Sequence, residues 1–126
     1  MTQEEIAHAF GGRLVGNSML KKIVSKTLTF FPDEIAEYIS RNCWFMGSLP
    51  DAWAYAFTGN DLKDKHMIFL SDELFEQSDR QIYFTIAHEI GHIILKHRNS
   101  IGFHQTKAEI AKQEKEADSF AHQFGF

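Results

Sequence analysis

The chain has 126 residues, a formal net charge of −4, and a composition that is 44% hydrophobic. This length and composition predict a single globular domain over residues 1–126, large enough to build a hydrophobic core. The acidic balance argues against a broad basic surface for nucleic acid, and no apolar stretch is long enough to span a membrane. The N-terminus lacks the basic and apolar regions of a secretion signal, so we expect a cytoplasmic protein.

Three short helices are predicted in the first third of the chain. Residues 3–10 form the first, which a glycine pair closes. The second covers about 18–26, and Asn17 or Ser18 can cap its N-terminus. The third covers about 32–42, because a proline suits the first turn of a helix.

Cys43 is the single cysteine of the sequence, which excludes a disulfide within the chain and fits a reducing compartment. Its neighbours are Trp44 and Phe45. This setting indicates a buried, small apolar residue rather than a metal ligand or a nucleophile.

The pattern then changes to one typical of strands. Residues 52–57 alternate large aromatic side chains with alanines, which predicts a strand. Residues 58–65 have the composition of a turn, and 66–70 are mostly apolar and predict a returning strand. We therefore expect an antiparallel β-hairpin, followed by a short helix capped by Ser71 or Asp72.

An apolar-rich segment over about 79–97 predicts a buried helix, and it contains the motif His-Glu-x-x-His at residues 88–92. His88 and His92 are four residues apart, so both imidazoles lie on one face of the helix and can reach a single zinc ion. Glu89 lies beside the metal, where it can take a proton from a water molecule on the ion. The alternative is a core helix whose histidines are merely hydrogen-bonded, but that arrangement is costly without a shared partner.

Gly91, inside the same motif, weakens an isolated helix by about 1 kcal/mol relative to alanine. A glycine at this position makes sense if another chain segment must pass close to the helix beside the ligands. The motif therefore predicts a neighbouring element that contributes to the site.

A second helical pattern over about 106–123 contains candidates for the third zinc ligand. Glu114 and Asp118 share one face, so Glu114 can bind the ion while Asp118 accepts a hydrogen bond from a ligand histidine. Glu116 points about 200° away from Glu114, and the two glutamates cannot serve together. Taken alone, this charged run is better interpreted as a solvated helix face.

Taken together, the segments FTIAHEIGHIIL at 84–95 and EKEADSFA at 114–121 resemble the ImmA/IrrE-type zinc metallopeptidases, a gluzincin-like family. The resemblance implies that Glu114 is the third zinc ligand, with Asp118 behind a ligand histidine and Glu116 at a variable position. It implies an α+β, zincin-like fold that is mostly helical, with a short antiparallel β-hairpin packed on the His-Glu-x-x-His helix. An exposed strand, with 52–57 as the candidate, would hold an extended peptide; a purely structural hairpin is the alternative.

The expected activity is zinc-dependent hydrolysis of peptide bonds, with Glu89 as the general base. Tyr55, His97, His104 and His122 are candidate donors to the oxyanion, although each is individually better interpreted as a surface or core residue. The family includes enzymes that cleave a transcriptional repressor, so we expect a protein or peptide substrate of this regulatory kind. The alternatives are a non-catalytic, zinc-stabilised module that binds a regulatory protein and, more weakly supported, a zinc hydrolase acting on a non-protein amide.

Overall fold

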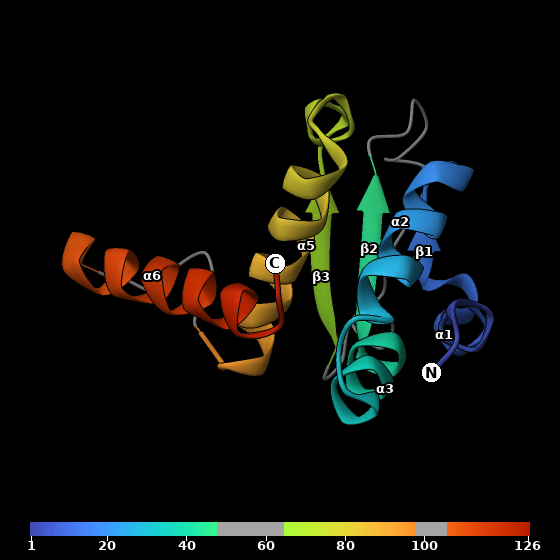
Figure 1. The fold of residues 1–126 in the computed structure, drawn as a ribbon, viewed down its shortest axis with the longest axis horizontal. Helices are drawn as coiled ribbons and strands as arrows, with labels where there is room; N and C mark the ends of the chain where they lie inside the picture. The colour runs from blue at the N-terminus through green and yellow to red at the C-terminus, as the bar shows by residue number, and fades with distance from the viewer. Residues whose placement is uncertain (48–64, 98–105) are drawn as a thin grey trace. The chain divides into compact units, whose positions relative to one another are not determined.

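The computed structural model of the chain describes residues 1–47, 65–97 and 106–126 (Figure 1). Contacts divide it into two compact units, Met1–Ser78 and Asp79–Phe126. The elements are, in order, α1 (Gln3–Phe10), η1 (Gly11–Arg13), β1 (Leu14–Val15), α2 (Ser18–Leu28), α3 (Asp33–Asn42), β2 (Cys43–Gly47), β3 (His66–Leu70), η3 (Asp72–Glu76), α5 (Asp79–Ile94) and α6 (Lys107–Gln123). Within the described residues, no helix is long and apolar enough to cross a membrane.

The first three helices confirm the sequence prediction, and their ends have physical causes. Thr2 and Glu5 form a capping box at the start of α1. The side chain of Asn17 accepts a hydrogen bond from the backbone N–H of Leu20, at 2.9 Å, and so caps α2. Pro32 is the residue before α3, where its missing N–H costs nothing.

The sheet of the first unit differs from the predicted hairpin. Its three strands lie in the order β1-β2-β3, and both pairs are parallel, as the arrows in Figure 1 show. The strand predicted over 66–70 is confirmed as β3, but its neighbour is β2, with Phe45 opposite Ile68. The antiparallel pairing is therefore wrong for the described sheet, and the predicted strand 52–57 lies outside the described residues.

The pairing was missed because β2 gives a weak sequence signal. Its residues, Cys-Trp-Phe-Met-Gly, do not alternate between polar and apolar, since a strand in a parallel sheet can be covered on both faces. Strand β1 has two residues, too few for any period. Periodicity identifies a strand but carries no information about which strand pairs with it.

The core of the first unit lies between its helices and the sheet. The ring of Phe10 from α1 meets that of Phe45 from β2 edge-on, with centroids 5.7 Å apart. Cys43 is fully buried beside them in β2, and this burial raises the pKa of its thiol to about 12. A protonated, inaccessible thiol is neither a nucleophile nor a ready metal ligand, as predicted.

The second unit consists of α5 and α6, which pack against each other. The C-terminal half of α6 lies against α5, while residues 107–112 of its N-terminal half are exposed (Figure 1). A Cβ atom on Gly91 would come within 3.0 Å of the Phe120 ring. Gly91 therefore lets α6 approach α5 closely, as its place in the motif predicted.

Candidate metal centre

Helix α5 brings the two motif histidines together. His88 and His92 are one turn apart on one face, and their Nε2 atoms are 3.0 Å apart. Their side chains are largely buried, at 14% and 7% exposure. The two rings are nearly perpendicular and do not stack face to face. The Nε2 atoms of both rings therefore approach the same position.

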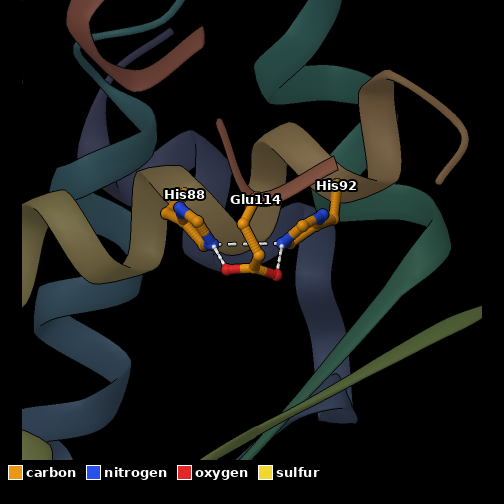
Figure 2. A group of neighbouring side chains, drawn as sticks. All are labelled: His88, His92 and Glu114. Atoms are coloured by element: carbon orange, nitrogen blue, oxygen red, sulfur yellow. Dashed lines mark hydrogen bonds and ion pairs between the residues drawn. The ribbon is translucent and has the colours of Figure 1, made fainter. Parts of the chain in front are cut away.

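Glu114 reaches the same position from α6. Its Oε2 lies 3.0 Å from Nε2 of His88, and its Oε1 lies 3.0 Å from Nε2 of His92 (Figure 2). The three ligand atoms all lie within 4.8 Å of one another and could hold a metal ion. The glutamate side chain is 54% exposed, whereas those of the two histidines are largely buried.

The spacing of these atoms fits a zinc site. With bonds of about 2.0–2.1 Å and tetrahedral angles, two zinc ligands lie about 3.3 Å apart. The distances here are 3.0 Å, a few tenths of an ångström shorter. Two imidazoles and one carboxylate also form a donor set that zinc accepts, with a fourth position free for water. The residues therefore fit the metal in both chemistry and spacing.

Asp118 holds His88 from behind. Its Oδ1 lies 2.7 Å from Nδ1 of His88, on the side of the ring away from Glu114. A carboxylate only accepts hydrogen bonds, so the network assigns the proton of a neutral His88 to Nδ1. The lone pair of Nε2 is then directed at the candidate centre, which is the form that a metal requires.

The surroundings of His92 favour its neutral form. Burial lowers the pKa of His92, and the neighbouring His88 lowers it further, while the carboxylates of Glu114 and Glu89 oppose these effects. A neutral imidazole keeps a lone pair for a metal without competition from a proton. Glu89 follows His88 on α5 and is half-buried, close enough for its charge to be felt at His92.

Two residues that sequence reasoning set aside lie next to the centre. Nδ1 of His97 is 2.9 Å from Nδ1 of His92, and Nε2 of His97 is 3.4 Å from Oε2 of Glu116. Counting 100° per residue placed His97 well off the ligand face, but α5 ends at Ile94 and the chain turns back. The only signal that could have found this contact was the need for a partner at Nδ1 of His92.

The remaining candidate donors are less informative. His122 lies beside Phe84, with ring centroids 5.3 Å apart, and its Nδ1 is 2.9 Å from the backbone oxygen of Phe126. These contacts with Phe84 and with the backbone of Phe126 indicate a structural role for His122. Tyr55 and His104 lie outside the described residues.

Comparison with protein families gives a match between residues 53–126 and the model of the family Peptidase U49. The chain belongs to this family. The match covers more than half of the chain and includes both α5 and α6, so every residue of the candidate centre lies inside it. No curated protein and no solved structure gave a match.

Membership in Peptidase U49 supports a peptidase activity for this chain. The matched region includes α5 and α6, and the three residues that could hold a metal lie on these two helices. The match to a family of peptidases and the cluster of side chains that could hold a metal therefore lie in the same part of the sequence.

Proposed function

We propose that this chain is a zinc-dependent metallopeptidase of the gluzincin type, with His88, His92 and Glu114 as the zinc ligands and Asp118 positioning His88. The convergence of two imidazoles and one carboxylate at 3.0 Å carries the proposal, together with the family match. When bound, zinc would polarise the scissile carbonyl and lower the pKa of water toward about 7. The resemblance to the ImmA/IrrE-type enzymes supports the same ligand set.

In this proposal, Glu89 is the general base and then the general acid. It accepts a proton from the attacking water as the new C–O bond forms at the carbonyl carbon. It then gives that proton to the amine nitrogen as the C–N bond breaks. Its place next to His88 on α5, half-buried and beside the ligands, suits both steps.

We propose that the substrate is a specific regulatory protein, such as a transcriptional repressor, in the cytoplasm. The resemblance to enzymes that cleave such proteins supports this choice. The net charge of −4 supports recognition of a protein rather than of nucleic acid. The exposure of Glu114 supports access by an extended peptide from its side of the centre.

The competing function is a non-catalytic module that uses zinc for stability and binds a regulatory protein. Structural zinc sites are usually closed by four protein ligands, whereas three are present in the cluster of described residues. A purely structural ion would also have no use for a carboxylate at Glu89. Both observations favour the peptidase.

Glu89→Gln separates the two functions. We expect the purified wild-type chain and the variant to hold about one zinc per chain. We expect the variant to lose peptide hydrolysis by roughly 10²–10⁴-fold, because the amide cannot take the proton. Cleavage of a peptide library, followed by mass spectrometry, measures this loss.

Glu109→Gln is a suitable control, because it changes an exposed glutamate in the first turn of α6. Hydrolysis at the wild-type rate is expected for it. If Glu89→Gln instead keeps full biological activity, the binding module becomes the better account. Proteins retained by the Glu89→Gln variant and cleaved by the wild type would identify the substrate.

A further inference from the structure

Both candidate ligand histidines are contacted at the ring nitrogen that faces away from the centre. For His88 the partner is Asp118, at 2.7 Å. For His92 the partner is His97, at 2.9 Å, which in turn lies 3.4 Å from Glu116. We propose that His97 and Glu116 are positioning residues that orient His92 and fix its tautomer for zinc. This inference rests on the proposed zinc centre.

The backbone at the end of α5 is built to bring His97 back onto His92. Lys96 has a φ of 58°, the left-handed conformation that usually closes a helix with glycine. The N–H of Lys96 donates to the carbonyl of Ile93 at 3.1 Å, and the N–H of His97 donates to the carbonyl of His92 at 2.9 Å. These are the two hydrogen bonds of a Schellman motif.

The motif ties the backbone of His97 to the same residue that its side chain contacts. The ring centroids of His97 and His92 are 5.1 Å apart and the ring planes are inclined at 63°, with the two Nδ1 atoms 2.9 Å from each other. A hydrophobic contact frequently accompanies this motif at the equivalent positions. Here two imidazoles occupy them, which indicates that the contact serves His92.

The hydrogen-bond network assigns the protons along the chain of contacts from His92 through His97 to Glu116, called here the His92 arm. The carboxylate of Glu116 only accepts, so a neutral His97 carries its proton on Nε2 and presents the lone pair of Nδ1. That lone pair can only accept from His92, whose proton therefore lies on Nδ1. The free lone pair of His92 is then on Nε2, directed at the centre, as in His88.

Along the His92 arm, the side chains become more exposed with distance from the candidate centre. The side chain of His97 is 7% exposed, whereas that of Glu116 is 43% exposed. An imidazole that is so deeply buried needs a hydrogen-bond partner at both nitrogens, and it has one at each. We therefore expect removal of His97 to matter more than removal of Glu116.

Zinc affinity, measured by competition with a chromophoric chelator, tests the inference without any activity assay. We expect His97→Phe to weaken zinc binding by about 10- to 100-fold, the range for such outer partners, and Asp118→Ala to do the same for the His88 arm. His97→Gln should recover part of the loss, because its carbonyl oxygen can accept from His92. Glu116→Ala should give a smaller loss, and Glu109→Ala none.

The exchange of the His92 Nδ1 proton gives a second measurement, and Glu116→Ala tests it while the His97 ring itself is retained. In the zinc-loaded wild type, ¹⁵N spectra of the imidazoles should show a protonated Nδ1 on His92, with its proton protected from exchange. In His97→Phe and Glu116→Ala, that protection should fall. The conservative variant His97→Gln and the exposed-side variant Glu116→Ala keep the test decisive if His97→Phe fails to fold.

Two results would overturn the inference in distinguishable ways. If the wild type binds zinc and His97→Phe binds it equally well, with an unchanged His92 signal, the positioning role is wrong and the zinc centre stands. If the wild type binds no zinc, the centre itself fails and the inference falls with it.

Discussion

The buried hydroxyls of the first compact unit and the buried imidazoles of the second find their hydrogen-bond partners differently. In the first unit, the buried hydroxyls donate to carbonyls three or four residues earlier in their own helices, as for Ser25, Thr27 and Ser40. In the second unit, side chains 19 to 30 residues apart contact one another: His97 with Glu116, His88 with Glu114, and His88 with Asp118. The first pattern satisfies polarity locally, whereas the second requires the tertiary fold.

The energetic consequences of the two patterns also differ. A helix hydroxyl bonded to its own backbone is satisfied by itself. In the second unit, the assigned tautomers direct two nitrogen lone pairs toward a carboxylate at 3.0 Å, with no proton between them. Such an arrangement is unfavourable unless a cation lies among the three groups. The convergence of several titratable side chains in the second unit is therefore the stronger indication of a functional site.

The largest expected effect comes from removing the carboxylate of this cluster. Glu114→Ala should weaken zinc binding by more than about 100-fold, beyond the range for outer partners, because one of three ligands is lost. Calorimetric titration with zinc measures this loss of zinc affinity. Glu37→Ala in the first unit is a matched control, since the two glutamate side chains are 57% and 54% exposed.

The control should leave zinc affinity unchanged, although it breaks the pair between Glu37 and Arg41 at 3.2 Å. If Glu116→Ala abolished zinc binding and Glu114→Ala did not, the assignment of the third ligand would be wrong. Side chains far apart in sequence would still converge in the second unit, because the third ligand would still come from α6.

A smaller effect is expected from Gly91→Ala, which adds a methyl group where α6 crosses α5. Its Cβ would lie 3.0 Å from the Phe120 ring, and overpacking of this kind costs about 1–3 kcal/mol. Alanine recovers about 1 kcal/mol of helix propensity. We expect zinc affinity to fall roughly tenfold, equivalent to about 1.4 kcal/mol, because α6 carries Glu114.

Gly12→Ala in the first unit is the control for this prediction, since nothing lies within 4 Å of its added Cβ. Chelator competition on both variants gives the comparison. Unchanged zinc affinity in Gly91→Ala would mean that the ligands tolerate a displacement of α6.

The smallest effect is expected from Thr27→Val in α2. The hydroxyl donates to the carbonyl of Ile23 at 2.8 Å, but that carbonyl keeps its backbone partner in the helix. We expect the free energy of unfolding to fall by less than about 1 kcal/mol and zinc affinity to stay the same. Urea unfolding and zinc titration measure these two quantities. A clear loss of zinc affinity would contradict the separation between local and long-range polar contacts.

The helices of the fold could be predicted from sequence, but the sheet could not. Caps such as Asn17 and Thr106 act within one turn, so short-range patterns locate the helix ends. The parallel pairing of β2 with β3 joins residues distant in sequence, whereas the turn-like composition of residues 58–65 suggested a hairpin between 52–57 and 66–70. Pairing depends on the covering of both sheet faces, which no short window contains.

For the candidate site, too, contacts within one helix could be predicted from sequence, whereas contacts that depend on the end of α5 or on the packing of α6 could not. A period of 3.6 residues is sufficient to place His88 beside His92 and Glu114 above Asp118, because each pair belongs to one helix. The same arithmetic set His97 aside, since it assumed that α5 continues where Lys96 in fact turns the chain back. The sequence alone thus determined which side chains share a helix face. Only the tertiary structure decided which faces meet, because the close approach at Gly91 joins helices that are separate in sequence. The turn after Ile94 was also visible only in the structure, because Lys96 adopts a left-handed conformation that its residue type does not favour.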